Sequence, residues 1–277
     1  MKRNLKFYLK NKLSKRELKL VPSSFDVVGG ILIFSEFPKE LTKKEKIIGQ
    51  TILENYHNIK TIIKKTRKYS GKFRTPKLSI IAGQKKKETV CKENNISIKL
   101  NVEEVYFSPR MASERKRIAG LIKLNESVLV MFSGVAIYPL VIAKNTRCKE
   151  VYGIEINAVA HKYALLNIKK NKLENKIKIF LGDVRKMMPK INKKFDRILM
   201  PLPKGGENFL DLALKYIKKN GNIHFYDFEH ENETYKAEEK VKSACEKSTK
   251  NCTILKVVKC GQYSPRFYRI CIDFLVD

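Results

Sequence analysis

Two strand-like runs in the second half of the chain end in residues that suit a nucleoside cofactor. The first ends in Phe132-Ser133-Gly134, and the second ends in Glu155-Ile156. A glycine lets the backbone approach a ligand at a helix start, and a carboxylate about 20 residues later can accept hydrogen bonds from ribose hydroxyls. An ordinary strand-to-helix turn and a solvated carboxylate are the alternatives. The apolar neighbours of Glu155 favour the ligand role.

The next two strand-like runs add a carboxylate and a stiff loop. One ends in Asp183-Val184, where the carboxylate can accept a hydrogen bond from an adenine amino group. The other ends in Pro201-Leu202-Pro203-Lys204, and its two prolines restrict the backbone so that the loop can bracket a planar base. No G-x-G-x-x-G motif is present. The four strand ends together predict S-adenosylmethionine rather than NAD as the cofactor.

The elements that must position these residues alternate along the chain from Phe107 onward. Strand-like and helical runs follow one another, and the chain ends in two strands, Ile254–Cys260 and Phe267–Val276, with no helix between them. This order predicts an α/β fold, a class I methyltransferase Rossmann-like sheet that is mostly parallel with an antiparallel last strand. The five preceding strands are expected at Ser127–Phe132, Glu150–Ile154, Ile177–Leu181, Asp196–Met200 and Asn222–Phe228.

The first part of the chain predicts a different layout. Residues 1–22 read as a basic, weakly helical arm, residues 23–105 as a small α+β RNA-binding domain, and residues 106–277 as the methyltransferase domain. Isoleucines at roughly helical spacing predict one helix over Lys39–Lys65. Short strands are expected at about 78–82, 88–92 and 96–101, with a turn at Asn94-Asn95.

The composition favours a polyanionic partner. The 277 residues contain 58 Lys and Arg against 28 Asp and Glu, a formal net charge of +30. A compact chain with this excess repels itself, and nucleic acid binding is the usual reason to keep it. Lysine enrichment of the whole genome is the alternative explanation.

The sequence also predicts the compartment. No apolar stretch follows the basic start, and the run Ser127–Ala143 is short of a bilayer span and contains Gly and Pro. We expect a cytoplasmic protein with no membrane association. The six cysteines include no C-x-x-C pair, so buried free thiols are expected and no metal; a disulfide stays open for a hyperthermophilic source.

Three segments resemble the archaeal and eukaryotic tRNA (guanine-N1)-methyltransferases, which modify the guanosine 3′ of the anticodon. They are GKFRTPKLSIIAG at 71–83, VYFSPRMASER at 105–115 and DRILMPLPKGGENFLD at 196–211, and the resemblance covers about 25–277. It implies roles for individual residues. Arg74 steadies guanine O6, Glu114 is the general base, Glu155 and Asp183 hold the cofactor, and Pro201 and Pro203 hold the target base.

Three positions depart from the family pattern. Pro201 stands where the family usually has Asn, Val130 replaces Asp, and Ala136 replaces the second Gly. The Pro-Leu-Pro form of the loop resembles the archaeal subgroup that also methylates C7 of 4-demethylwyosine. Strict specificity for guanine N1 is therefore open.

Further residues are expected to contact the anticodon stem-loop of a tRNA. Tyr106 and Phe107 are candidates for base stacking, Arg110 and Arg115 for phosphates, and Leu202 and Lys204 for the target nucleotide. For Glu114 the plain alternative is an i, i+3 pair with Arg117, and for the arginines it is a solvated basic face.

Two rival functions remain on the sequence alone. A wybutosine-pathway aminocarboxypropyltransferase would share the layout and the cofactor. A non-catalytic tRNA-binding protein with a decayed cofactor site would explain Val130 and Ala136. The favoured prediction is a monomeric tRNA methyltransferase acting at N1 of guanosine 37, with C7-methylation of 4-demethylwyosine as an open second activity.

Overall fold

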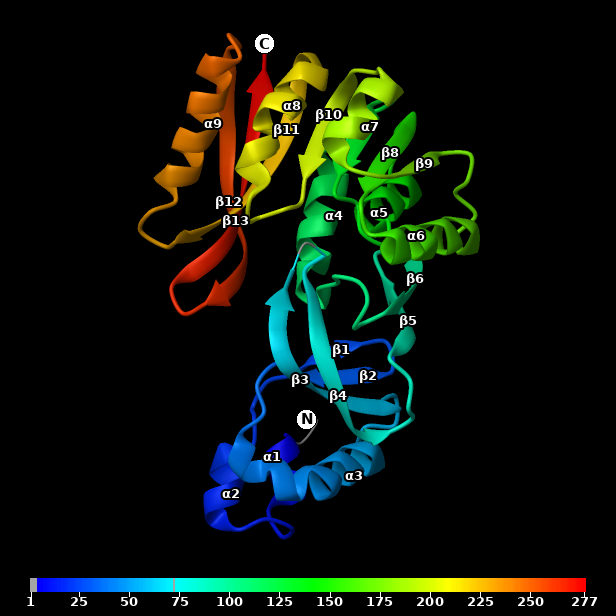
Figure 1. The fold of residues 1–277 in the computed structure, drawn as a ribbon, viewed down its shortest axis with the longest axis vertical. Helices are drawn as coiled ribbons and strands as arrows, with labels where there is room; N and C mark the ends of the chain where they lie inside the picture. The colour runs from blue at the N-terminus through cyan, green and yellow to red at the C-terminus, as the bar shows by residue number, and fades with distance from the viewer. Residues whose placement is uncertain (1–3, 72) are drawn as a thin grey trace. The chain divides into compact units, whose positions relative to one another are not determined.

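The computed structural model describes residues 4–71 and 73–277. The chain divides into two compact units, Met1–Lys92 with Ser97–Pro109, and Glu93–Ile96 with Arg110–Asp277 (Figure 1).

The first unit packs three helices and a four-stranded sheet around an apolar core. The sheet has the order β1-β2-β3-β4, and α3 packs on β4. Leu32, Phe34, Ile48, Ile52 and Ile62 are fully buried in this core. The bounds are α1 Leu5–Leu9, α2 Lys15–Leu20, β1 Asp26–Val28, β2 Ile31–Phe34, η1 Lys39–Lys44, α3 Glu45–Asn55, β3 Thr61–Ser70 and β4 Thr75–Gly83.

The residues predicted as a separate basic arm belong to this core. Asn4 caps α1 by accepting a hydrogen bond from the Phe7 N–H, and a capping box at Ser14 begins α2. Leu5 and Leu9 are buried in the same cluster as α3. The buried leucines of 4–22 therefore anchor this segment, and most of its polar residues face water, together with parts of Phe7 and Leu20.

The single helix predicted over Lys39–Lys65 is wrong. It is interrupted after Asn55, and Ile62 and Ile63 lie on β3, which pairs in parallel with β2 and antiparallel with β4. The run of β-branched residues from Thr61 fits a pleated, buried surface better than a helix, and tertiary pairing decided between the two periodicities.

A two-stranded hairpin follows, formed by β5 Glu88–Glu93 and β6 Ile96–Asn101. Its turn residues Asn94 and Asn95 both have positive φ, 42° and 64°, as a two-residue hairpin turn requires. The predicted strands and the predicted turn at this position are confirmed.

The second unit is a seven-stranded sheet with the order β12-β13-β11-β10-β7-β8-β9. All described pairings are parallel except those of β13 with β11 and β12. The predicted fold class is confirmed. The bounds are η2 Pro109–Met111, α4 Ala112–Leu121, β7 Ser127–Met131, α5 Ile137–Asn145, β8 Glu150–Glu155, α6 Ala158–Lys170, β9 Ile177–Leu181, α7 Val184–Ile191, β10 Phe195–Met200, η3 Gly206–Phe209, α8 Leu210–Tyr216, β11 Ile217–His230, α9 Tyr235–Lys247, β12 Cys252–Ser264 and β13 Phe267–Val276.

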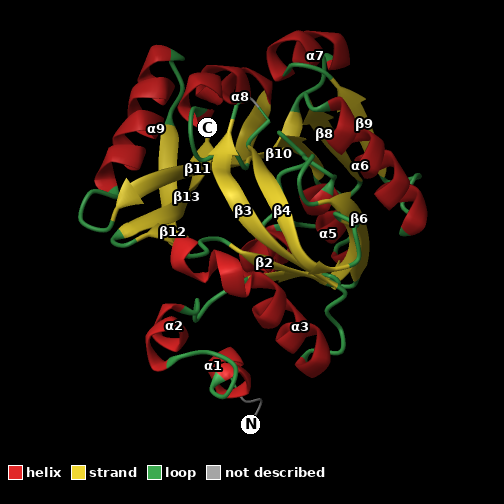
Figure 2. Ribbon diagram, turned by 60° about the horizontal axis from the view of Figure 1, so that its bottom comes forward, coloured by secondary structure: helices red, strands yellow, loops and turns green. Residues whose placement is uncertain are grey.

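Helices cover the sheet on both faces (Figure 2). On one face, α7, α8 and α9 bury residues such as Met188, Leu214 and Val241 against Phe195 and Phe225. On the other, α4 and α5 pack on each other and supply the polar partners of β11 described below. The parallel strands are buried from both sides, which is why β7 is apolar at four of its five positions.

Two details of this unit differ from the sequence predictions. Helix α7, Val184–Ile191, was not predicted, because Pro189 within it reads as a helix breaker. Strand β11 begins at Ile217 rather than Asn222, and an irregularity in its pairing with β10 separates Ile217 from Asn222.

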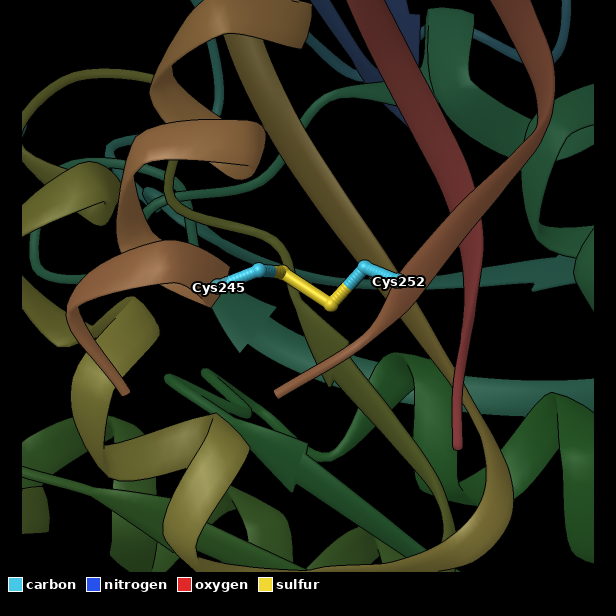
Figure 3. The surroundings of a disulfide bond; sticks show 2 residues. All are labelled: Cys245 and Cys252. Atoms are coloured by element: carbon cyan, nitrogen blue, oxygen red, sulfur yellow. A yellow bond between two sulfur atoms is a disulfide. The ribbon is translucent and has the colours of Figure 1, made fainter. Parts of the chain in front are cut away.

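One cysteine pair corrects the expectation of free thiols. Cys245 near the end of α9 and Cys252 at the start of β12 form a disulfide (Figure 3). The other four cysteines, Cys91, Cys148, Cys260 and Cys271, are free. Helix α9 and β12 are thereby joined covalently across a seven-residue separation. Among the described residues, no helix has the length and hydropathy needed to cross a membrane.

Candidate active site

The turn after β7 has an unusual backbone. Phe132, Gly134 and Ala136 all have positive φ, at 62°, 58° and 65°. The left-handed region costs a residue with a Cβ about 1 kcal/mol or more, so the surroundings must hold this turn in place. Apart from its own chain neighbours, no heavy atom lies within 4 Å of the position that a Cβ on Gly134 would take. The turn therefore leaves open space beside its glycine, as a backbone that approaches a ligand requires.

Glu155 at the end of β8 holds this turn. Its Oε2 accepts a hydrogen bond from the Gly134 N–H at 2.7 Å, and its Oε1 accepts one from the Asn157 N–H at 2.7 Å. The residue is 9% exposed, and burial raises the pKa of its carboxyl although the backbone N–H groups oppose the shift. The structure thus brings the predicted residues Gly134 and Glu155 together, with half-buried Ile156 next in the chain.

Asp183 and Phe132 line the neighbouring strand ends. Asp183 caps α7 by accepting a hydrogen bond from the Arg185 N–H at 2.9 Å, and the next residue, Val184, is buried. The Phe132 ring meets the Phe209 ring edge-on with centroids 5.0 Å apart. The turn after β7 is thereby tied to the segment that follows β10.

The Pro201–Lys204 loop follows β10 at the same sheet edge. The Leu202 N–H donates to the Met200 carbonyl at 2.7 Å, which closes a tight turn around Pro201. Pro201, Leu202 and Pro203 are half-buried, and Lys204 is exposed. Because β10, β7, β8 and β9 are neighbours in the sheet and parallel, their carboxyl ends meet at one edge. Cofactors of open α/β sheets bind there.

Glu114 on α4 is buried beside Tyr226 of β11, with 5% of its surface exposed. The Tyr226 hydroxyl donates to its Oε1 at 2.7 Å. The Arg117 guanidinium donates to Oε2 at 2.7 Å and to Oε1 at 2.8 Å. The i, i+3 ion pair between Glu114 and Arg117 that the sequence spacing allowed is therefore formed. The role of Glu114 as general base stays a prediction.

A polar network continues from Arg117 into the sheet. Arg117 pairs with Asp273 at 2.6 Å, and Asp273 accepts a hydrogen bond from His224 Nδ1 at 2.6 Å. Arg197 donates to His224 Nε2 at 2.8 Å and pairs with Glu126. Burial alone would raise the pKa of Asp273, but the hydrogen bonds from His224 and Arg117 outweigh it and hold that pKa well below its usual range.

Three members of this region, His224, Cys271 and Asp273, are close enough together for their donor atoms to hold a metal ion. Two guanidinium groups, from Arg117 and Arg197, hydrogen bond to Asp273 and His224. These fixed cations disfavour a metal ion there. The cluster is accounted for as a structural network.

The other predicted residues lie in several places. Arg74 is on the β3–β4 turn of the first unit with φ 51°, and Tyr106 is 37% exposed there. Phe107 is half-buried and lines a small apolar pocket of that unit with Val28 and Leu78. Arg110 is exposed at the start of the second unit.

Arg115 corrects a sequence prediction. It was expected to contact RNA, but it is 3% exposed and forms a two-pronged ion pair with Glu93, with both N–O distances 2.6 Å. Glu93 stands at the end of β5 and satisfies the guanidinium. The side chain serves folding in this structure rather than a phosphate.

Sequence reasoning missed Tyr226 and Asp273. Asp273 is a carboxylate inside the apolar run Ile270–Val276, which was the available signal, whereas Tyr226 stands beside Asp227 and Glu229 in a mixed stretch that gave no such signal. Nothing local in the sequence indicates that both would meet α4, because 112 positions separate Tyr226 from Glu114 and 156 separate Asp273 from Arg117.

Comparison with known proteins identifies the family. Residues 89–255 match the TRM5/TYW2 methyltransferase domain, and residues 5–86 match the TYW2 N-terminal domain. The chain therefore belongs to the TRM5/TYW2 methyltransferase family. The family predicted from the sequence, the methyltransferase class and the dependence on S-adenosylmethionine are confirmed.

Individual relatives are similar over most of the chain. The tRNA (guanine(37)-N(1))-methyltransferase Trm5b of Pyrococcus abyssi is 39% identical over 94% of this chain and 76% of its own length, and its crystal structure superposes with a TM-score of 0.86 over 96% of this chain and 78% of that one. The tRNA (guanine(37)-N(1))/4-demethylwyosine(37)-methyltransferase Taw22 of Nanoarchaeum equitans is 34% identical over 90% of this chain and 98% of its own. A complex of aTrm5 with tRNALeu is 30% identical, with a TM-score of 0.86 over all of this chain and 79% of that one.

Proposed function

We propose that this chain methylates N1 of the guanosine at position 37 of tRNA, beside the anticodon, with S-adenosylmethionine as donor. The observation that carries the proposal is the placement of Glu114, a buried carboxylate at the sheet edge where Glu155 holds the Gly134 turn. The names of the relatives Trm5b and Taw22 support guanosine 37 as the target. The relative solved with tRNALeu supports tRNA as the substrate.

The methyl donor sits against the strand ends in this proposal. Gly134, Glu155, Ile156 and Asp183 are the residues that hold it, with Phe132, Val184 and Pro201 beside them. S-adenosylmethionine supplies an electrophilic methyl group on a sulfonium. Glu155 orients the turn through the Gly134 N–H, so its buried carboxylate fixes the backbone that the cofactor approaches.

Glu114 serves as the base. Guanine N1 carries a proton and must give it up to Glu114. The electron pair of the N–H bond, shared between N1 and O6, would then form the N1–methyl bond, while the methyl–sulfur bond would break with its pair staying on sulfur, leaving S-adenosylhomocysteine. A carboxylate offers about four lone-pair sites. Tyr226 and Arg117 use three of them, which leaves one for the N1–H. Arg74 keeps the role of a cation for O6 that the resemblance gives it.

The loop Pro201-Leu202-Pro203-Lys204 holds the target base in this proposal. Its first residue favours a second activity, C7-methylation of 4-demethylwyosine at the same nucleotide. Pro201 has no side-chain amide that could hydrogen bond selectively to the edge of guanine. A larger tricyclic base therefore loses no hydrogen bond at this position. The relative Taw22 is named for both activities. The proposal keeps the expectation from the sequence that the enzyme acts as a monomer.

Nucleoside mass spectrometry tests the proposal. The chain is incubated with tRNA carrying guanosine 37 or 4-demethylwyosine 37, and with S-adenosylmethionine labelled either in the methyl or in the aminocarboxypropyl group. We expect methyl label in N1-methylguanosine; methyl label on the tricyclic base as well would establish the second activity. Transfer of the aminocarboxypropyl label to tRNA would show that the chain catalyses the rival reaction and not methyl transfer. No label on either tRNA would favour a non-catalytic protein.

The variant Glu114→Gln tests the base in the same assay. It keeps the shape of the side chain but cannot take the N1 proton. We expect turnover to fall at least a hundredfold while tRNA binding stays within twofold. Full activity would remove Glu114 from the mechanism.

A further inference from the structure

The last three strands of the second unit extend past the rest of the sheet. Pairing of β10 with β11 ends at Met200–Phe225, whereas β11 and β13 stay paired as far as His230–Phe267. The segment Tyr226–His230 therefore projects beyond the end of β10 by about 17 Å at ~3.3 Å per residue. Figure 1 shows the hairpin of β12 and β13, coloured orange to red, reaching past the ends of the other strands of this unit.

The two faces of the extension differ in composition. Asp227 and Glu229 point to one face, where Lys240 of α9 pairs with both at 2.6 and 2.7 Å. Side chains alternate along a strand, so Tyr226, Phe228 and His230 share the opposite face. That is the face on which Tyr226 meets Glu114. The surface beyond Tyr226 is thus continuous with the candidate active site.

Aromatic rings and guanidinium groups gather on this face. The centroids of the Tyr263 and Phe228 rings are 4.3 Å apart. The Arg269 guanidinium lies over the Phe228 ring, 5.2 Å from its centroid. His230 meets Phe267 edge-on at 5.3 Å. We call Phe228, His230, Tyr263, Phe267 and Arg269 the hairpin platform.

The platform is exposed in a way that ordinary core aromatics are not. Tyr263 is 67% exposed and Phe267 42%. The neighbouring Arg266 side chain is 75% exposed, and its ion pair with Glu231 is long at 3.8 Å. Exposed rings supported by other rings and flanked by arginines match the surfaces on which unstacked bases stack.

We propose that the hairpin platform binds single-stranded nucleotides of the tRNA anticodon loop next to the target base, with Tyr263 stacking on a base and Arg266 contacting a phosphate. The proposal rests on the proposed function. RNA is the occupant that fits, because the rings are flanked by cations on a chain of net charge +30. The platform also begins at the sheet edge where Glu114 and the Pro201 loop lie, so a bound loop would place its neighbouring nucleotide there.

Tyr263→Ala tests the stacking, with Tyr235→Ala as the matched control. Tyr235 is also a half-exposed tyrosine of this unit, 50% exposed, but it lies on α9. Binding of a tRNA transcript with unmodified guanosine 37 is measured by fluorescence anisotropy. We expect Tyr263→Ala to weaken tRNA binding about tenfold. Tyr263→Phe and Tyr235→Ala should stay within twofold of the unsubstituted chain.

A charge reversal tests the phosphate contact. Arg266→Glu and the control Lys236→Glu change the net charge equally, and each removes a basic residue from one surface ion pair. We expect Arg266→Glu, but not Lys236→Glu, to reduce the slope of log Kd against log salt by about 1. Binding of S-adenosylmethionine, measured by calorimetry, should be unchanged in all these variants.

The outcomes separate the two proposals. Normal tRNA binding by Tyr263→Ala, or equal weakening by Tyr235→Ala, would overturn the platform and leave the proposed function standing. Failure of the unsubstituted chain to bind tRNA would overturn both.

Discussion

The phenolic oxygen of Tyr226 lies 2.7 Å from Oε1 of Glu114, and the Tyr138 hydroxyl in turn donates to Tyr226 at 3.1 Å. The two phenols form a chain of donors that ends on the carboxylate. Burial raises the pKa of both phenols well above the ordinary value. They therefore remain neutral donors at working pH, and the carboxylate is held in one orientation.

Replacing Tyr226 with Phe should lower kcat about tenfold with little change in KM. The variant removes one donor to Glu114, so the carboxylate is less well oriented toward the N1 proton. The Tyr138 hydroxyl also loses its acceptor, which costs about 1–3 kcal/mol of stability. Steady-state kinetics and thermal unfolding measure the two effects. A rise in KM with unchanged kcat would mean that Tyr226 acts on binding and not on the base.

The buried pair of Arg115 with Glu93 should matter for folding rather than for RNA. Arg115→Ala leaves the Glu93 carboxylate without its guanidinium, and breaking a buried pair costs about 3–5 kcal/mol. Arg110→Ala, at an exposed position five residues earlier in the chain, is the control and should cost under about 0.5 kcal/mol. Urea unfolding distinguishes them. Equal stability of the two variants, with weaker tRNA binding by Arg115→Ala, would restore the RNA role.

The parts of the site that sequence could predict are those that depend on strand ends. Glu155 and Asp183 each follow an apolar run, and parallel topology brings such ends to one edge. The close approach of Gly134 to Glu155 follows from the same rule. A local pattern and one topological principle were enough.

The parts that failed depend on pairing between distant segments. Asp273 meets Arg117 only because β13 inserts beside β11, and no local pattern encodes that register. The sequence suggested that Arg115 is a solvent-exposed basic residue, because its partner Glu93 lies 22 positions earlier, on the β5 strand of a hairpin. Ile62 and Ile63 fit a helical period, and only pairing with β2 and β4 makes them a strand.

His224 should make stability depend on pH. Arg197 donates to Nε2, so the buried ring is neutral and its Nδ1–H donates to Asp273. Burial lowers the pKa of His224 below its usual value, so the unfolded chain binds a proton that the folded chain does not. The contribution of His224 to the free energy of unfolding is therefore fully present above about pH 6.5. It falls as the pH drops below that value, by at most about 1.4 kcal/mol per pH unit.

Urea unfolding between pH 7.5 and 5 measures this dependence, with His224→Gln as the variant that removes it. His161 also has a pKa lowered by burial, so His161→Gln is the control for the smaller effect of a less buried ring. An unchanged slope in His224→Gln would show that another group takes up the proton.

The disulfide should stabilise the second unit. Closing a loop of this length, with the cysteines seven residues apart, constrains the unfolded chain by about 2–3 kcal/mol. The double variant Cys245→Ser/Cys252→Ser should unfold at lower urea concentration than the oxidised chain and should no longer respond to reductant. The remaining free cysteines serve as the internal control, since reductant does not change them. A chain whose stability ignores reductant would show that the pair is not bonded in solution.

Glu155→Gln should uncouple the cofactor turn from β8. The glutamate accepts hydrogen bonds from the Gly134 and Asn157 N–H groups through different oxygens, and an amide can offer only one oxygen. One N–H must then face an NH2 group, so the turn with its three left-handed residues loses a constraint. Hydrogen bonds to charged acceptors are worth about 1.5–3 kcal/mol, which corresponds to a 10–100-fold weaker binding of S-adenosylmethionine by calorimetry. Glu150→Gln is the matched control, because Glu150 lies at the other end of β8, where its carboxylate pairs with Lys178 and Lys193 and not with the turn. A Glu155→Gln protein that binds the cofactor as tightly as Glu150→Gln would show that the turn is held by the strand ends alone.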